Sequence, residues 1–150
     1  FRLLRSRGEK VSFAESLTGG LIAAAFVENS GASNVLDESY VTYAPASKVR
    51  ILGVNQETVD TVGVVSERCA REMAAGVKRI SGANWGVSAT GLAGPDGGTD
   101  ELPVGTVFIG VAGEDGVQVY ECHFAGDRMQ VRMQAAQRAF ELLAERIEKT

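Results

Sequence analysis

Ser16 stands in a polar turn between an expected strand and an expected helix. Residues 14–20 read AESLTGG, a β-like run at 10–14 precedes the serine, and an apolar run at 21–27 follows the turn. A helix start leaves four backbone N–H donors unpaired and carries a partial positive charge. The turn therefore predicts a nucleophilic hydroxyl beside a place suited to a phosphate or a developing oxyanion. The alternative is a helix cap, in which the hydroxyl only accepts a hydrogen bond from the first helical turn.

A second set of polar groups follows the next expected strand. Tyr43 ends a β-branched and aromatic run at 39–43, and Lys48 lies in the short helix that Pro45 opens. Ligand sites of open α/β sheets gather at strand carboxyl ends, so these side chains share a rim with the serine turn. A serine hydroxyl needs an adjacent base at neutral pH. The single histidine, His123, lies in an alternating strand-like run, which leaves the lysine as the candidate base. Alternatively, the tyrosine packs on the sheet and the lysine is solvated.

Two further motifs are candidates for binding a phosphate-bearing ligand. Residues 90–99, TGLAGPDGGT, begin a glycine-rich loop after an expected strand at 85–90. Arg128 and Arg132, four residues apart, share one face of the last expected helix. Either arginine, together with a helix N-terminus, suits a phosphate. The alternatives are a plain connecting loop and surface charges, since the loop matches neither common nucleotide-binding glycine motif.

The elements that must position these residues alternate between strands and helices. Beyond those named, a helix is expected to end at Gly8, and Ser66 is expected to cap a helix with one apolar face. Strands at 106–112 and 117–124 are joined by GEDG into an antiparallel hairpin, and a long amphipathic helix begins near Arg128. We therefore expect an α/β fold, a three-layer α/β/α sandwich with a mixed sheet of about five strands. Residues 1–150 are expected to form one domain.

Composition narrows the classes of partner. The formal net charge is −4, which argues against nucleic acid as the main partner, and no apolar run reaches the length of a membrane span. Two cysteines and one histidine leave no metal-ligand cluster, so we expect neither a metal nor a cofactor. Two isolated cysteines in a chain that builds its own core also favour a reducing compartment, and we expect a cytoplasmic protein.

Taken together, the motifs resemble a known family. The blocks AESLTGG at 14–20, VTY at 41–43 with its following lysine, VVS at 64–66 and TGLAGPDGGT at 90–99 are similar to those of the CinA C-terminal domain. PVGTV at 103–107 and GDR at 126–128 extend the likeness over nearly the whole chain. The family includes the nicotinamide mononucleotide amidohydrolases (PncC), which stand alone or are fused in competence/damage-inducible proteins.

The resemblance implies deamidation of nicotinamide mononucleotide (NMN) to nicotinic acid mononucleotide and ammonia at a serine–lysine site without metal. It makes Ser16 the nucleophile and Lys48 the base, with Tyr43 assisting proton transfer. The substrate-binding set is then Thr18, Gly19, Gly20, Thr90, Gly91, Gly94, Arg128 and Arg132. The backbone amides of residues 18–20 would hold the oxyanion. We further expect a homodimer or another homo-oligomer.

One departure from the family pattern keeps another function open. The family commonly has Ser-Asn-Glu-Ala between the tyrosine and the lysine, whereas residues 44–47 read APAS here. The spacing is kept, but the supporting contacts of that turn change. The alternatives to an amidohydrolase are therefore a nucleotide-binding regulatory module without turnover and a scaffold domain that has lost its ligand.

Overall fold

The computed structural model describes residues 1–150 and contains one mixed five-stranded sheet in the order β2-β1-β3-β4-β5. Strands β1 and β2 run parallel, as do β1 and β3, whereas β4 is antiparallel to both β3 and β5. The strands are β1 (Val11–Glu15), β2 (Leu36–Val41), β3 (Trp85–Gly91), β4 (Thr106–Gly113) and β5 (Gly116–His123). The expected mixed sheet and its terminal hairpin are confirmed.

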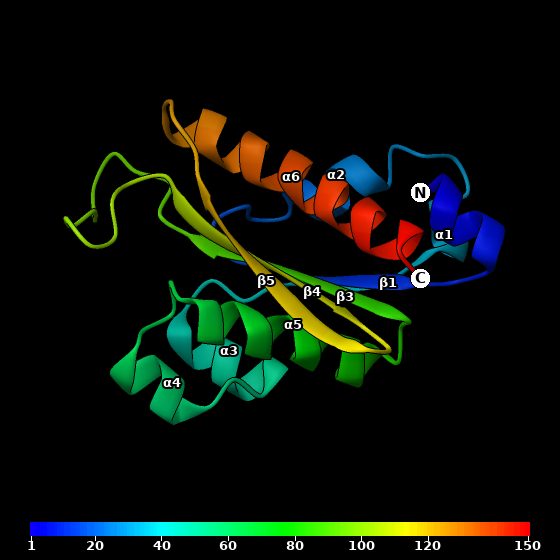
Figure 1. The fold of residues 1–150 in the computed structure, drawn as a ribbon, viewed down its shortest axis with the longest axis horizontal. Helices are drawn as coiled ribbons and strands as arrows, with labels where there is room; N and C mark the ends of the chain where they lie inside the picture. The colour runs from blue at the N-terminus through cyan, green and yellow to red at the C-terminus, as the bar shows by residue number, and fades with distance from the viewer.

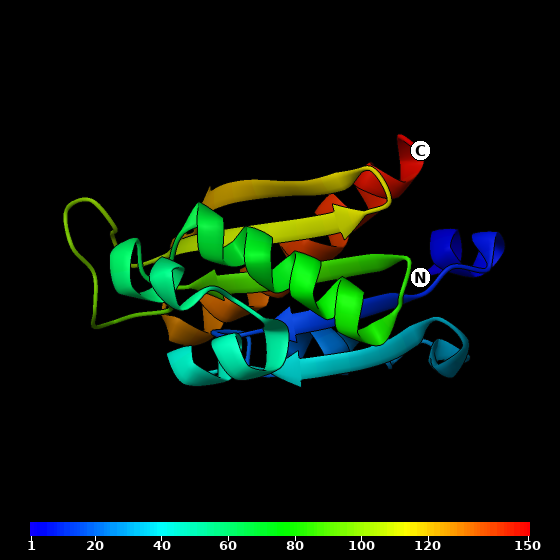
Figure 2. The ribbon, with the colours of Figure 1, turned by 90° about the horizontal axis from the view of Figure 1, so that it is seen from below.

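Helices cover both faces of this sheet (Figure 1). The helices are α1 (Arg2–Arg7), α2 (Leu21–Phe26), α3 (Pro45–Leu52), α4 (Gln56–Thr61), α5 (Glu67–Ser81) and α6 (Arg128–Glu148), with a short 3-10 turn η1 (Ala32–Asn34). Figure 1 places α1, α2 and α6 on one side and α3, α4 and α5 on the other, and Figure 2 shows the second group from below. The three-layer α/β/α arrangement is therefore confirmed. None of the helices is long and apolar enough to pass through a membrane.

Two apolar clusters hold the layers together. The larger lies between the sheet and α1, α2 and α6, and includes Phe13, Phe26 and Leu142. The smaller, around Met73, lies between α3, α5 and the other face of the sheet. Gly110 lets α5 approach that face closely, because a Cβ there would lie 2.7 Å from the Ala70 carbonyl oxygen. Burial on both faces explains why β1, β3 and β4 are almost wholly buried, whereas edge strand β5 alternates.

Several predicted boundaries hold, and two shift. Gly8 and Gly53 end α1 and α3 in the left-handed conformation, and the Ser66 hydroxyl accepts the Cys69 amide as the expected cap of α5. Strand β2 covers 36–41 rather than 39–43, so the tyrosine that follows belongs to the connection into α3. Helix α2 ends at Phe26, earlier than the apolar pattern predicts, because turns and η1 occupy the following residues.

The parallel strands β1, β2 and β3 all end at the same edge of the sheet. Their carboxyl ends are followed by the Ser16 turn, by the connection into α3, and by the long 92–105 loop that extends beyond the sheet in Figure 1. The fold thereby gathers three of the polar motifs of the sequence at one rim.

Candidate active site

Lys48 and Ser16 meet at this rim. The Lys48 Nζ lies 3.0 Å from the Ser16 Oγ, 2.6 Å from the Thr42 carbonyl oxygen and 3.2 Å from the Tyr43 carbonyl oxygen. The Ser16 amide donates to the Ala89 carbonyl at 3.0 Å, so its backbone continues the sheet while its hydroxyl reaches the lysine. The predicted proximity of serine and lysine is confirmed.

The surroundings of Lys48 favour an uncharged amine. The side chain is fully buried, and no carboxylate forms an ion pair with it. Burial lowers the pKa of Lys48 from its ordinary value, opposed only by a smaller contribution from the nearby Cys69 thiol. A neutral amine keeps two N–H donors for the Thr42 and Tyr43 carbonyls, and its lone pair then faces the Ser16 hydroxyl. Of the three hydrogen-bond partners of Lys48, only the Ser16 hydroxyl carries a proton that it can exchange with the amine.

The altered turn before the lysine still forms the helix that carries it. Pro45 occupies the first turn of α3, and Ala44 precedes it in an extended conformation. The Ser47 hydroxyl donates to the Ala44 carbonyl at 2.7 Å. The APAS sequence therefore starts α3 without a side-chain cap, and hydrogen bonds from the Ser47 hydroxyl and the Lys48 amide to the Ala44 carbonyl hold its first turn.

A buried carboxylate closes the start of α2. Glu15 is fully buried and accepts the amides of Gly20, Ile22 and Ala23, each at 3.0 Å, and the Ser39 hydroxyl at 3.3 Å. The carboxylate thus neutralises the positive end of α2 from inside the protein. The expectation that this helix start is open to a phosphate is wrong, because its own sequence supplies the anion.

The amides left free in the turn differ from those expected. The Gly19 amide donates to the Ser16 carbonyl at 3.0 Å, and the Gly20 amide is taken by Glu15. The prediction that these two glycines offer free N–H groups is therefore wrong. The amides of Leu17 and Thr18 have no protein acceptor, and both follow Ser16 directly. Leu17 keeps a small exposed fraction, so its N–H remains available to an oxyanion, whereas Thr18 is fully buried.

A cleft of about 250 Å³ opens over Ser16. Its walls combine the serine turn, the connection to α3 and the glycine-rich loop, with Ser16, Leu17, Tyr43, Val64, Val65, Thr90, Gly91, Leu92, Ala93, Gly94, Asp96 and Arg128. The Thr90 hydroxyl donates to the Val64 carbonyl at 2.8 Å and so joins the loop before α5 to the sheet. Of the predicted substrate-binding residues, Thr90, Gly91, Gly94 and Arg128 line this cleft.

The two arginines of α6 have different surroundings. Arg128 lines the cleft, where it donates to the Gly94 carbonyl at 2.8 Å and to the Tyr43 hydroxyl at 3.2 Å. Arg132 lies outside the cleft and donates to the carbonyls of Leu17 and Thr18 at 2.8 and 3.2 Å. Although both arginines lie near the serine turn, only Arg128 faces the space that a substrate would occupy.

Residues 1–147 match the family model described as the CinA C-terminal domain. The chain belongs to this family. A CinA-like protein from Anaeromyxobacter sp. (strain K) is 50% identical over 140 residues, which are 93% of this chain and 34% of that protein. The nicotinamide-nucleotide amidohydrolase PncC of Enterobacter agglomerans is 49% identical over 134 residues, or 89% of this chain and 82% of that enzyme. This CinA C-terminal domain thus spans about a third of the CinA-like proteins it matches and most of the PncC enzyme.

Solved structures agree with the family assignment. A CinA superfamily protein from Klebsiella pneumoniae 700603 superimposes with a TM-score of 0.95 at 34% identity, covering 99% of this chain and 93% of that one. A competence/damage-inducible protein from Agrobacterium tumefaciens gives a TM-score of 0.92 at 41% identity, covering 95% and 87%. This CinA C-terminal domain therefore shares its α/β fold with both of these proteins.

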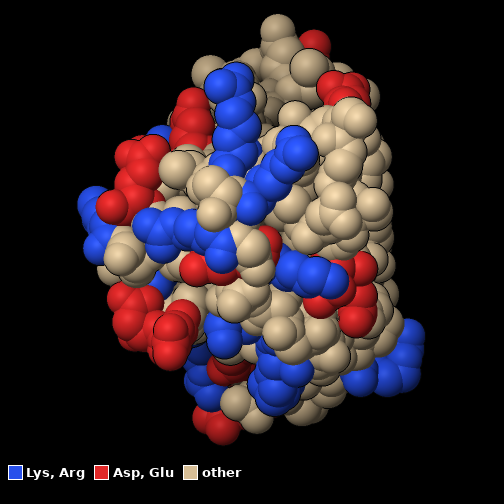
Figure 3. Space-filling view, turned by 90° about the vertical axis from the view of Figure 1, so that its right-hand side faces the viewer, with Lys and Arg blue, Asp and Glu red and all other residues tan.

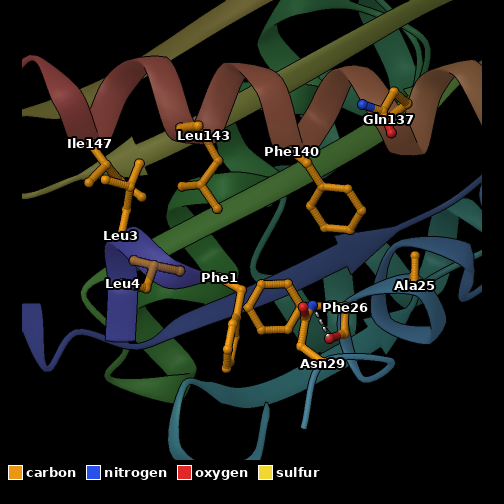
Figure 4. A pocket seen from close by; sticks show the side chains of 11 residues that line it. Phe1, Leu3, Leu4, Ala25, Phe26, Asn29, Gln137, Phe140, Leu143 and Ile147 are labelled. Carbon is orange, nitrogen blue, oxygen red and sulfur yellow. Dashed lines mark hydrogen bonds between the residues drawn. The ribbon is translucent and has the colours of Figure 1, made fainter. Parts of the chain in front are cut away.

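The remaining surfaces of this CinA C-terminal domain offer less chemistry. A cavity of about 290 Å³ between α1, α2 and α6 is lined mainly by apolar side chains such as Phe1, Phe26 and Phe140, and its Asn29 amide is bonded to the Phe26 carbonyl (Figure 4). The face on which both termini lie mixes acidic and basic side chains (Figure 3). His123 lies on edge strand β5 beside Glu121, as its alternating pattern predicts, and no three His, Cys, Asp or Glu side chains gather as metal ligands.

Two features of the site escaped the sequence analysis. Leu17 enters through its backbone amide, for which its side chain carries no signal. Glu15 does carry a signal in the sequence, because it is a carboxylate at the end of a strand whose other residues are almost all apolar. A charge in such a place must be bonded to buried donors, and the next helix start supplies them.

Proposed function

We propose that this domain is an amidohydrolase that deamidates NMN to nicotinic acid mononucleotide and ammonia. The observation that carries the proposal is the 3.0 Å contact between the Ser16 Oγ and the Nζ of Lys48, which is fully buried and forms no ion pair with a carboxylate. The similarity to the nicotinamide-nucleotide amidohydrolase of Enterobacter agglomerans supports the choice of a nicotinamide nucleotide as substrate. Ser16, Lys48 and the adjacent cleft then have the roles of nucleophile, base and substrate pocket.

The reaction follows from the groups present. The Ser16 Oγ attacks the carboxamide carbon while its proton passes to the neutral Lys48 amine. The carbonyl oxygen becomes an oxyanion, which the amide of Leu17 stabilises. The Lys48 ammonium gives its proton to the departing nitrogen, and ammonia leaves an ester on Ser16. Water then attacks this ester with Lys48 again as base, which releases the carboxylic acid product and restores the serine.

Arg128 is the residue we propose for the substrate phosphate. It is the only cationic side chain that lines the cleft, and its two bonds to Gly94 and Tyr43 leave further N–H donors available. The Tyr43 hydroxyl contacts neither Ser16 nor Lys48 here, so the proton-transfer role expected from the family lacks a supporting contact. We propose instead that Tyr43 orients Arg128.

Ammonia release from NMN by the purified domain tests this function, with Ser16→Ala and Lys48→Ala measured beside the parent. We expect turnover by the parent, loss of turnover in both variants, and NMN affinity within a few-fold of the parent in Ser16→Ala, because the hydroxyl is needed for bond making. Chelator should leave the parent rate unchanged. Tight NMN binding by the parent without ammonia release would instead support a regulatory module, and neither binding nor release would support a scaffold.

A further inference from the structure

Arg132 holds the two carbonyls next to the free amides of the serine turn. Its Nε donates to the Leu17 oxygen at 2.8 Å and its Nη2 to the Thr18 oxygen at 3.2 Å, across more than 110 residues of sequence. The guanidinium fits closely because residue 19 is glycine: a Cβ on Gly19 would lie 3.1 Å from Nη2. The contact is therefore a specific docking of α6 onto the turn after β1.

The geometry of the peptide group fixes the directions of the Leu17 and Thr18 N–H groups, which have no protein acceptor. A trans peptide is planar, so its C=O and N–H point in opposite directions. The bond from Arg132 to the Leu17 oxygen therefore directs the Thr18 N–H away from α6. The preceding peptide is fixed in the same way, because the Ser16 oxygen accepts the Gly19 amide and the Leu17 N–H must point to the other side.

We propose that Arg132 is a positioning residue that holds the turn bearing Ser16 and the oxyanion-binding amide of Leu17, rather than a ligand of the substrate phosphate. This inference rests on the proposed amidohydrolase function. Its Nε and Nη2 are engaged by carbonyls, its Nη1 lies 3.8 Å from the Met129 sulfur, and the side chain does not line the cleft.

The test compares Arg132→Met and Arg132→Lys with Arg138→Met as a matched control. Arg138 lies on the same helix, where it pairs with Glu141 and Glu145. Removing one oxyanion donor outright costs about 10²–10³-fold in kcat in a well-studied protease. We expect Arg132→Met to lower kcat about 10–100-fold with KM for NMN within about 3-fold, Arg132→Lys to lie between this variant and the parent, and Arg138→Met to match the parent.

Two kinetic results would overturn the inference. One is an unchanged kcat in Arg132→Met, and the other is a raised KM with kcat preserved, which would place the arginine on the phosphate. Absence of NMN turnover in the parent would refute the proposed function instead. The orientation is then tested separately by amide NMR, in which Arg132→Met should shift the Thr18 N–H resonance and speed its hydrogen exchange, whereas Arg138→Met should change neither. Unchanged Thr18 signals would refute the positioning role. Arg132→Lys serves all these measurements if the Met variant fails to fold.

Discussion

Lys48 approaches Ser16 to 3.0 Å from a helix that lies 32 residues further along the chain. The Lys48 Nζ also donates hydrogen bonds to the carbonyls of Thr42 and Tyr43, which lie at the point where the chain leaves β2. The end of one parallel strand thus holds the base, and the end of its neighbour holds the nucleophile. This arrangement determines how the rate should depend on pH.

The first prediction concerns the pH dependence of kcat/KM. Burial lowers the pKa of Lys48 below its ordinary 10.5, which increases the neutral fraction of the amine at any given pH. Because only the neutral amine accepts the serine proton, kcat/KM for NMN should rise with pH through the folded-state pKa of Lys48 and level off below pH 10.5. The measurement is a pH–rate profile of the parent and of Lys48→Met.

Variants of Lys48 test whether the rise of kcat/KM with pH comes from this lysine or from another titrating group. Lys48→Met should show a residual rate without the rising limb, and Lys48→Arg should not restore activity, because a guanidinium keeps its proton throughout this range. A parent rate that falls between neutral pH and pH 9.5 would contradict a neutral lysine as the base.

The second prediction separates binding from chemistry. Arg128→Ala should raise KM for NMN about 10–100-fold, the loss expected for a charge-assisted contact of about 1.5–3 kcal/mol, while kcat stays within a few-fold. Tyr43→Phe should raise KM by less, because it removes only the hydroxyl that accepts from Arg128 at 3.2 Å. Steady-state kinetics with NMN check both. A preserved KM in Arg128→Ala would mean that the phosphate is bound elsewhere.

The sequence predicts which side chains meet at the carboxyl ends of the parallel strands. Ser16 and Lys48 come after successive strands whose helical crossovers force them to be parallel, so their meeting at one sheet edge follows from topology. Thr90 reaches the same rim because β3 is parallel to β1. Periodicity and capping residues also predict the order of the elements, since Ser66 caps the start of α5 and Gly53 ends α3.

The distribution of backbone hydrogen bonds in the turn could not be predicted in the same way. Gly19 and Gly20 look available in sequence, but their amides are taken by the Ser16 carbonyl and by Glu15. Helical spacing places Arg128 and Arg132 on one face, yet only the three-dimensional docking of α6 decides that one faces the cleft and the other the turn. Such choices depend on tertiary contacts, which local patterns do not contain.

The third prediction concerns Cys69, which is buried behind Lys48. Burial raises the pKa of its thiol from 9.0 to about 11, so above pH 9 the unfolded chain loses a proton that the folded chain keeps. Stability due to this group is full below pH 9 and is lost as the pH rises through 11. The free energy of unfolding of the parent minus that of Cys69→Ala should fall by about 1–2 kcal/mol between pH 8 and 10.5, as urea unfolding would measure. Cys122, present in both proteins, cancels; a constant difference would contradict the prediction.

The last prediction concerns Glu15, which stabilises the turn from inside. Glu15→Gln keeps the size of the side chain but replaces one acceptor oxygen with an NH₂ group, which meets an N–H donor of α2 or the Ser39 hydroxyl. It also removes the negative charge from the start of the helix. We expect the free energy of unfolding to fall by about 1–3 kcal/mol, because a buried backbone donor loses its acceptor and the helix dipole loses its anion.

Activity should fall with stability in this variant, since the Glu15 side chain fixes Gly20 and the residue after Glu15 is the nucleophile. We expect a lower kcat even at temperatures where Glu15→Gln is fully folded by circular dichroism. Glu28→Gln is the matched control, because Glu28 is exposed just beyond the other end of α2 and should change stability by less than about 0.5 kcal/mol. A Glu15→Gln protein as stable as the parent would mean that the α2 amides find another acceptor, and the carboxylate would then not be what shapes the turn.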